Sequence, residues 1–507
     1  MSVAEDIRPD ASRPNAPMTG PFLSFRDYIA ALEARGRVIR IPEMDQDKYE
    51  TTAFTYKLID KYGYYSAPTF LVERVKQDGK WIEGPLIGNP YGGWDTEALG
   101  FGVEEITDDH RAMYKAAMEK VKALATPGGT WKRIPPVEIE RDKAPCKEIV
   151  HTGDDVDITQ YAFIMSNPAD GGRYLNMGST IIQDPKFGRN VGTYRCQIKG
   201  PKKIGVNPEP GQNAWVIIMN SRRAGQKSIK AAIVVGADPI TWGMSSSKVA
   251  PPGMDELEFA GGFMGRPIEV VKCETSDIVV PAHAEMVIEG EIPMDMEEEG
   301  PFGEMYGYLG LKKEQNVYMN IACITHREKP WVLNSSNGVT RGYLTAPVEA
   351  TLFLNLKRTI YNLLGVHTPT HATGYVIAGI EKRMPGDGMA AGMQIAGNLN
   401  IAKVTIVVDS DIDIYNFDEV MAAVGARWQP GPSSLIVDGT RGMRLDPSAA
   451  NRELGSKIII DATRKLPNEG GPEVYPKLNR ALLKEMCPET FDLVDDKWAS
   501  YVKDFEG

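Results

Sequence analysis

The spacing of hydrophobic positions divides the chain into three parts with different secondary-structure signals. In the first part, apolar positions recur at the three- and four-residue spacing of helices, and a β-type run lies at residues 69–73. The predicted helices span residues 24–36, 45–62 and 108–124. We therefore expect a small N-terminal α+β domain over residues 23–130. Residues 1–22 show no such pattern and are rich in Asp, Pro, Asn and Ser, which predicts a disordered tail.

Short β-type runs with turns between them follow over residues 131–335. The candidate strands are residues 179–183, 191–198, 214–219, 229–235, 268–273, 285–290 and 317–324. Regular spacing of such runs is typical of a β-sandwich or a β-barrel. The Pro-containing stretch 132–145, which precedes them, is predicted to be a linker.

Helical and strand patterns alternate over residues 336–507. Predicted helices at residues 348–364, 389–398, 418–426 and 477–486 alternate with predicted strands at residues 374–380, 404–408 and 457–461. This alternation predicts a C-terminal α/β domain with a mainly parallel sheet and helices on its faces.

Composition and charge narrow the class of protein. The 507 residues carry a net charge of -11, which argues against nucleic acid or an anionic membrane surface as the main partner. No apolar run approaches the roughly 20 residues that cross a bilayer, and the N-terminal residues do not resemble a signal peptide. The five cysteines are scattered and form no close pair, which predicts reduced thiols in a cytoplasmic protein.

Acidic residues crowd the segment around Glu299-Gly-Pro-Phe-Gly-Glu304. Closely packed carboxylates and apolar neighbours both raise the pKa of a carboxyl group. Glu304, between Phe302 and Tyr306, would then keep a proton near neutral pH and donate it to a carbon or oxygen atom. A solvent-exposed acidic turn is the alternative interpretation of the same residues.

A polar stripe runs along the predicted strand that begins near Asn190. Strand alternation places Thr193, Arg195 and Gln197 on one face and Tyr194 on the other. The planar guanidinium of Arg195 is suited to a carboxylate, because it donates two parallel hydrogen bonds. The alternative is a strand whose polar face is simply exposed to solvent.

Two further patterns carry candidate chemistry. Asn190, Asn213 and Glu258 offer oxygen atoms to a hard cation such as Mg²⁺ or Mn²⁺, although Asn and Glu are also common on surfaces. Glycines at residues 386–392, with Asp409 about twenty positions on, resemble a dinucleotide-binding pattern. Five residues separate the preceding predicted strand from the first of these glycines, which favours an ordinary β-loop-helix instead.

Together these motifs resemble the UbiD-like family of prenylated-flavin-dependent decarboxylases. The matching motifs are Asn190-x-x-x-x-Arg195, Glu258-Phe-Ala-Gly, residues 267–275, Glu299-Gly-Pro-Phe-Gly-Glu304, Val408-Asp-x-Asp-Ile-Asp413, Gly455-Ser-Lys457 and Asp461-Ala-Thr. The motif that ends at Glu304 is the most specific. The run over residues 93–102 favours the branch that acts on aromatic acids, such as protocatechuate decarboxylase.

The resemblance implies an N-terminal α+β domain, a central split β-barrel that binds the flavin, and a C-terminal α/β domain that dimerises. It also implies prenylated FMN supplied by a partner prenyltransferase, with Mn²⁺ or Mg²⁺ and K⁺ near its phosphate. By position, the implied metal ligands are Asn190, Asn213 and Glu258. The other implied cofactor-binding residues are Thr193, Tyr194, Arg195 and Gln212. The family usually has His where this chain has Asn213.

The resemblance further implies a catalytic network of Arg195, Glu299 and Glu304. Arg195 would bind the substrate carboxylate, Glu304 would protonate the product carbon, and Glu299 would hold Arg195. A cofactor is needed because side chains cannot accept the electrons that CO₂ leaves behind. We therefore expect reversible, non-oxidative decarboxylation of an aromatic or heteroaromatic acid, phenolic acids included.

Three other functions remain open at this point. One is decarboxylation of α,β-unsaturated, cinnamic-type acids. Another is a nicotinamide-dependent oxidoreductase that uses residues 386–392. The third is a flavin-binding or scaffold protein without catalytic activity.

Overall fold

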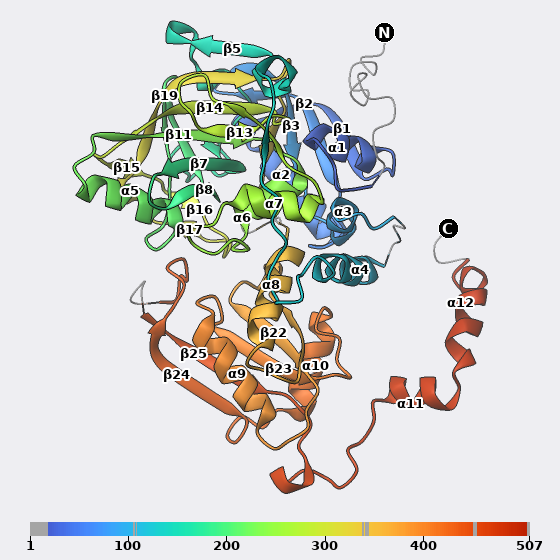
Figure 1. The fold of residues 1–507 in the computed structure, drawn as a ribbon. Coiled ribbons are helices and arrows are strands. Elements are labelled where there is room, and N and C mark those ends of the chain that lie inside the picture. The colour runs from blue at the N-terminus through green and yellow to red at the C-terminus, as the bar shows by residue number, and fades with distance from the viewer. Residues whose placement is uncertain are drawn as a thin grey trace.

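The computed structural model describes residues 19–104, 107, 109–336, 339, 344–449 and 454–503. Along this part of the chain, a small N-terminal sheet, a large central sheet and a C-terminal sheet follow one another (Figure 1). The fold is therefore a mixed α/β fold with more than one domain. No helix in the described ranges is long and apolar enough to cross a membrane.

The N-terminal sheet has four strands in the order β1-β2-β3-β20. Its strands are β1 (Val38–Asp45), β2 (Thr69–Gln77), β3 (Lys80–Gly88) and β20 (Val332–Asn334). Four helices accompany it: α1 (Phe25–Glu33), α2 (Glu50–Tyr62), α3 (Trp94–Gly100) and α4 (His110–Lys122). Ser24 and Asp27 form a capping box at the start of α1, where the sequence predicted that a helix begins. Strand β20 comes from residues 332–334, at the end of the range 131–335 that was predicted to form the central part. The predicted domain boundaries therefore stay predictions.

Two predictions for this region need correction. The predicted tail is too long at its C-terminal end, because Phe22 is fully buried and Gly20 N–H donates to the Leu99 carbonyl at 2.9 Å. Residues 1–18 lie outside the described residues. The helix predicted from residue 45 begins at Glu50, because residues 38–45 pair with β2 in a parallel ladder.

The central sheet has nine strands, eight of them in the order β6-β9-β10-β19-β14-β11-β7-β8, and β5 also pairs with β19. These strands are β5 (Ile149–Thr152), β6 (Tyr174–Leu175), β7 (Gly178–Asp184), β8 (Gly188–Thr193), β9 (Cys196–Gly200), β10 (Lys203–Gly205), β11 (Ser228–Val235), β14 (Met286–Pro293) and β19 (Tyr318–His326). Its middle strands are rich in Val and Ile, and their buried side chains belong to the largest apolar core. The split β-barrel stays a prediction.

Smaller sheets and three helices complete the central part. A three-stranded sheet contains β4 (Val137–Glu138), β12 (Glu269–Lys272) and β13 (Val279–Pro281). Two short antiparallel pairs are β15 (Glu297–Glu299) with β18 (Lys313–Asn316), and β16 (Phe302–Gly303) with β17 (Leu309–Gly310). The helices are α5 (Asn213–Arg223), α6 (Pro239–Ser246) and α7 (Glu256–Met264).

Two strand predictions in this part are wrong in detail. Residues 214–219 lie in α5 and form no strand, because Ala214, Ile217, Ile218 and Ser221 are buried at helical spacing along one face. The strand predicted over residues 191–198 is broken between β8 and β9, and Tyr194 and Arg195 lie at the break. The break frees the Arg195 side chain from the strict alternation of one continuous strand.

The C-terminal sheet has the order β21-β22-β23-β25-β24. Its strands are β21 (Leu363–His367), β22 (Tyr375–Ile380), β23 (Val404–Asp409), β24 (Ser434–Arg441) and β25 (Leu454–Asp461). The three central strands are parallel and both edge strands are antiparallel, so the prediction of a mainly parallel sheet is confirmed. Helices α8 (Ala346–Lys357), α9 (Asp387–Asn398) and α10 (Phe417–Arg427) accompany it. Helix α8 ends at Lys357, earlier than the predicted end at residue 364, and β21 begins at Leu363.

The last two helices lie away from these sheets. Helices α11 (Asn479–Met486) and α12 (Glu489–Tyr501) stand off from the rest of the molecule (Figure 1). No residue of either helix is buried. Their apolar side chains are therefore exposed to solvent in the single chain.

Candidate active site

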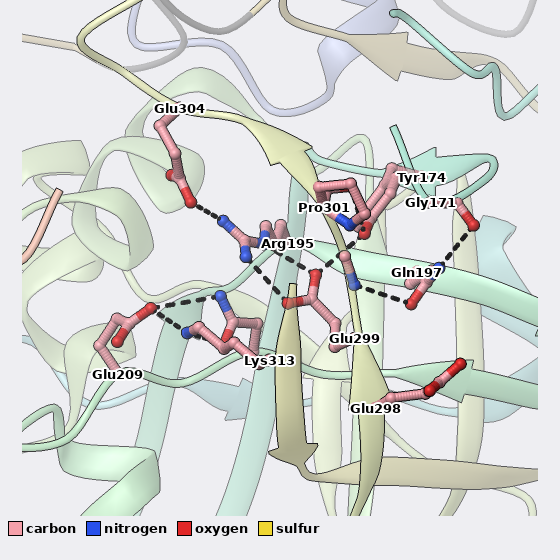
Figure 2. Close-up of polar contacts among 12 residues, drawn as sticks. Gly171, Tyr174, Arg195, Gln197, Glu209, Glu298, Glu299, Pro301, Glu304 and Lys313 are labelled. Carbon is pink, nitrogen blue, oxygen red and sulfur yellow. Dashed lines mark hydrogen bonds and ion pairs between the residues drawn. The ribbon is translucent and has the colours of Figure 1, made fainter. Parts of the chain in front are cut away.

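Arg195 meets both Glu299 and Glu304, although it lies more than 100 positions before either carboxylate (Figure 2). The Arg195 guanidinium donates from Nε to Glu299 Oε1 at 2.9 Å and from Nη2 to Glu299 Oε2 at 2.8 Å. Its Nη1 donates to Glu304 Oε1. The three side chains are 8%, 1% and 12% exposed, so the network lies almost entirely out of water.

Each side chain is positioned by the end of a short strand. Arg195 lies between β8 and β9, Glu299 ends β15, and Glu304 follows β16. Glu299 pairs with Lys313 in the ladder between β15 and β18, and Glu304 N–H donates to the Tyr308 carbonyl at 2.9 Å. Backbone hydrogen bonding therefore holds both Glu299 and Glu304 in place.

Three further residues support this network. Tyr174 donates its hydroxyl to Glu299 Oε1 at 3.0 Å, and the Arg195 guanidinium lies 5.0 Å from the centre of the Phe302 ring. The buried carboxylate of Asp170 accepts from Gly303 N–H at 2.9 Å, one residue before Glu304. Sequence reasoning missed Asp170 and Tyr174, because an Asp before two glycines has the pattern of an ordinary turn.

Burial and charge set opposite protonation preferences in the network. Burial raises the pKa of Glu304 above its usual range, and the adjacent Arg195 only partly opposes this. Burial disfavours the charged form of Arg195, but the hydrogen bonds and charges of Glu299 and Glu304 outweigh it and raise the pKa of Arg195. The arrangement therefore combines a permanently charged guanidinium with a carboxyl group that is easily protonated.

Glu304 lines a cavity of about 620 Å³. Its walls combine apolar side chains, including Trp215 and Leu309, with charged side chains, including Glu209 and Lys313. A volume of several hundred Å³ is typical of small-molecule sites. The proposed proton donor is therefore accessible to a ligand of that size.

A second cavity of about 730 Å³ contains most of the predicted cofactor-binding residues. Asn190, Thr193, Tyr194, Gln212 and Asn213 all line it. The Tyr194 hydroxyl donates to Asn190 Oδ1 at 3.3 Å, and the hydroxyls of Thr193 and Ser245 are 3.1 Å apart. The segment of residues 208–213 contributes to both cavities, because residues 208–210 line the first and residues 211–213 line the second.

The acidic residue that meets Asn190 is Glu256, and the predicted Glu258 lies elsewhere. Glu256 accepts from Asn190 Nδ2 at 3.0 Å and from Val191 N–H at 2.8 Å. Burial raises the pKa of Glu256 to about 7. Glu258 pairs with Arg133 at 3.3 Å and is not among the residues that line the cavity. Two positions apart on a helix are about 200° around the axis, so the two carboxyls face different ways.

The chemistry of the second cavity suits an anion and a hard cation. Arg133, Lys248 and Arg358 line it, and the buried hydroxyl of Ser247 has no hydrogen-bond partner in the described part of the chain. Asn213 begins helix α5, whose N-terminus carries a partial positive charge. Asn190, Asn213 and Glu256 supply oxygen donors. Within the described residues, no group of three or more His, Cys, Asp or Glu side chains is placed to hold a metal ion.

The glycines at residues 386–392 do not form an open phosphate site. Gly386 N–H donates to Glu469 Oε1 at 2.9 Å, and the main-chain N–H of both Arg383 and Met384 donates to Asp387 Oδ2. Carboxylates therefore already bind three N–H groups of the loop that precedes α9. Asp409 is bound by Arg464 N–H and pairs with Arg427 and the Arg464 side chain.

Two family models match the chain. The 3-octaprenyl-4-hydroxybenzoate carboxy-lyase Rift-related domain matches residues 137–339, and the C-terminal domain of the same carboxy-lyase matches residues 343–462. Among relatives, the phenolic acid decarboxylase of Sedimentibacter hydroxybenzoicus is 29% identical over 477 residues, which cover 90% of this chain and 94% of that protein.

Solved structures show the same relationship. The UbiD-class enzyme HmfF from Pelotomaculum thermopropionicum in complex with FMN has a TM-score of 0.77 and 28% identity, over 90% of this chain and 97% of that one. The vanillic acid decarboxylase of Sedimentibacter hydroxybenzoicus in its open form has a TM-score of 0.79 and 27% identity, over 94% of this chain and 99% of that one. The chain described here therefore belongs to the UbiD family of carboxy-lyases.

Proposed function

We propose that the protein catalyses reversible, non-oxidative decarboxylation of an aromatic or heteroaromatic acid, phenolic acids included, with prenylated FMN as cofactor. The similarity to a phenolic acid decarboxylase supports the substrate class. The relatives solved with FMN and with prFMN support the cofactor. Prenylated FMN, when bound, would supply the electron sink that side chains lack.

The observation that carries this proposal is the buried meeting of one guanidinium and two carboxyls beside a cavity. Glu299 holds Arg195 by two hydrogen bonds, which fixes the plane of the guanidinium. Glu304 has a raised pKa and faces the cavity, as a general acid should. In the proposed function, Arg195 binds the substrate carboxylate and Glu304 donates the proton to the product carbon.

The contact between Glu304 and Arg195 has a consequence for substrate binding. The Nε and Nη2 atoms of Arg195 are bound to Glu299, and Nη1 is bound to Glu304. A neutral carboxyl attracts a guanidinium less strongly than a carboxylate does. Protonation of Glu304 therefore loosens its contact with Nη1, and the substrate carboxylate takes its place. The same proton that Glu304 later donates thus favours substrate binding.

We propose that the second cavity binds the phosphate end of the flavin with Mn²⁺ or Mg²⁺. Asn190, Asn213 and Glu256 would hold the metal ion, with Glu256 in place of Glu258. The contact between Asn190 and Glu256 supports this assignment. The Tyr194 ring packs closely against Gly192 in the wall of this cavity. A Cβ atom at residue 192 would lie 2.4 Å from the Tyr194 hydroxyl, so the wall requires glycine there. A K⁺ ion, supply of the cofactor by a partner prenyltransferase and a cytoplasmic location stay predictions.

We further propose a homodimer that uses the C-terminal part of the chain. An evolved dimeric form of the relative HmfF has been solved. Helices α11 and α12 expose several large apolar side chains in the single chain. These side chains are Leu483, Met486, Leu493, Trp498 and Tyr501. Contact with a second copy would remove them from water.

The alternative functions have less support. A nicotinamide cofactor would have to displace Glu469 from Gly386 N–H. Decarboxylation of cinnamic-type acids uses the same network and differs only in the substrate. The charged side chains of the first cavity favour a more polar substrate than an unsubstituted cinnamic acid.

Release of CO₂ from a panel of acids by the Glu304→Gln variant tests the proposed function. The protein is co-expressed with a flavin prenyltransferase, and headspace CO₂ is measured. Loss of the acid should lower turnover by about 10²- to 10⁴-fold. The flavin absorbance of each preparation shows whether the cofactor is retained. Near-normal turnover by Glu304→Gln with full cofactor would rule out Glu304 as proton donor.

A further inference from the structure

We propose that Glu209 and Lys313 determine substrate specificity by binding a hydroxyl group on the ring of the acid. The inference rests on the proposed decarboxylase function and adds residues that select among the acids. Glu209 follows β10 in the loop of residues 208–213, and Lys313 begins β18. Neither residue belongs to a motif that the sequence analysis singled out.

The two residues form a charged pair in the wall of the cavity that contains Glu304. Lys313 Nζ donates to Glu209 Oε1 (Figure 2). It also donates to Asn207 Oδ1 at 2.7 Å. Their side chains are 23% and 24% exposed, so each is mostly withdrawn from bulk water but still faces the cavity. Glu209 Oε2 also lies 3.9 Å from Arg444 Nη1.

The same backbone contacts position this pair and the catalytic network. Lys313 is the ladder partner of Glu299, and Asn207 N–H donates to the Arg195 carbonyl at 3.1 Å. The pair therefore keeps a fixed relation to the guanidinium that would hold the substrate carboxylate. A substrate held by Arg195 would present the rest of its ring to a wall that contains Glu209 and Lys313.

A ring without polar groups fits such a wall poorly. Covering a charged pair with apolar surface removes its remaining water and returns no hydrogen bond, which is unfavourable. A hydroxyl group on the ring can donate to Glu209 and accept from Lys313. It therefore provides the hydrogen bonds that the displaced water made. Sites built to bind a hydroxyl discriminate strongly against analogues that lack it.

The pair favours a hydroxyl group over a second carboxylate. A carboxylate can only accept hydrogen bonds, so it would gain from Lys313 but would be repelled by Glu209. Asp446, in the same cavity, is also acidic. A hydroxyl group satisfies the donor and the acceptor at once. The selected substrate class is therefore the hydroxylated aromatic acid.

The charges of the pair also affect Glu304, and this decides the choice of variants. The negative charge of Glu209 raises the pKa of Glu304 further, after burial, whereas Lys313 and Arg195 lower it. A single substitution would thus change proton transfer together with binding. The double variant Glu209→Gln/Lys313→Met removes one charge of each sign and keeps the net charge near Glu304.

The test compares matched acids on wild type and this double variant. The acids are benzoic acid, its three monohydroxy isomers and benzene-1,4-dicarboxylic acid. Wild type should turn over and bind the best hydroxy isomer better than benzoic acid, and the double variant should lose about tenfold to a hundredfold of that preference. Turnover is measured as CO₂ release, and binding is measured by calorimetry on cofactor-loaded and cofactor-free protein.

A matched control removes the neighbouring charge outside the cavity. Lys312 pairs with Glu298 and does not line the cavity, so Lys312→Met should keep the wild-type preference. Thermal unfolding and flavin absorbance check that the double variant folds and binds its cofactor. The alkaline limb of the pH profile of kcat should move less in the double variant than in either single variant.

The outcomes separate this inference from the proposed function. If wild type releases CO₂ but the double variant keeps the same preference, or if wild type prefers benzoic acid or the dicarboxylic acid, the specificity pair is wrong and the decarboxylase proposal stands. If loaded wild type releases CO₂ from none of a broad set of acids, both are wrong.

Discussion

Asp170 shows how a single residue outside the catalytic network acts on it. Its carboxylate is buried and accepts N–H groups of Gly303 and Asn167 at 2.9 Å and 3.0 Å. Burial raises the pKa of Asp170 to about 6, against the effect of these N–H groups and of Arg195, and the charge of Glu304 raises it further. Because charge interactions are mutual, ionised Asp170 also favours the protonated form of Glu304.

This interaction predicts the direction of a pH shift in the variant Asp170→Asn. Glu304 acts in its protonated form, so kcat should fall as pH rises through the pKa of Glu304. Asp170→Asn keeps an acceptor for Gly303 but removes the charge. The pKa of Glu304 should then fall, and the alkaline limb of the kcat profile should move to lower pH. An unchanged limb would show that Asp170 positions the turn without affecting the acid.

At the scale of the element, the active site depends on two short strand pairs and one close approach of backbone. The pairs β15 with β18 and β16 with β17 place Glu299 and Glu304 on opposite sides of Arg195. Gly171 N–H donates to the Pro301 carbonyl at 2.7 Å, and the Gly171 carbonyl accepts from Gln197 at 2.8 Å. Residue 171 thus joins the turn between the two carboxyls to the strand that follows Arg195.

The close approach makes Gly171→Ala a test of this element. A Cβ atom at residue 171 would lie 2.4 Å from the Gly300 carbonyl oxygen, so the turn must move. Overpacking of this kind costs about 1–3 kcal/mol of stability, and turnover should fall because Glu299 and Glu304 flank the turn. Gly425→Ala in α10 is the control, because no atom lies within 4 Å of its Cβ position. It should gain up to about 1 kcal/mol. Unfolding midpoints and kcat measure both effects.

At the scale of the whole molecule, helix α8 joins the C-terminal sheet to the rest. Glu97 accepts from Ala346 N–H at 2.6 Å at the start of α8, and buried Glu349 accepts from the Tyr114 hydroxyl at 2.8 Å. Glu349 also contacts His367 Nδ1 in β21 at 2.8 Å. These contacts connect helices α3 and α4 with the C-terminal part through two buried carboxylates, Glu97 and Glu349. In the described part of the chain, helices α11 and α12 contact each other and stand off from the sheets (Figure 1).

The proposed dimer predicts that the tail controls association. Trp498→Asp introduces a charge at an apolar side chain of α12 that is 54% exposed in the single chain. If a second copy covers this side chain, the variant should weaken the dimer, as measured by sedimentation at several concentrations. Ser500→Asp adds the same charge two residues away and should have a smaller effect. Equal association of wild type and Trp498→Asp would show that α12 does not form the interface.

Features that depend on neighbouring residues could be predicted from the sequence, and features that depend on contacts between distant residues could not. The start of helix α1 at Ser24 and the strands β11 and β23 follow from local pattern, and those predictions are confirmed. Residues 214–219 are apolar enough to form either a strand or a helix. Their packing in the folded chain makes them part of helix α5. The choice between Glu256 and Glu258 depended on which face of α7 meets Asn190. No local pattern contains that information.

The sequence by itself determined the residue types of the site, because a general acid, a guanidinium and oxygen donors are chemical requirements that short motifs preserve. It also determined the alternation of helices and strands in the C-terminal part, which depends on local hydrophobic spacing. Only the tertiary structure decided which side chains meet, because contacts between distant segments follow from strand pairing and burial. It brought Glu209 and Lys313 to the cavity of Glu304, and it closed the glycine loop at Gly386 with Glu469.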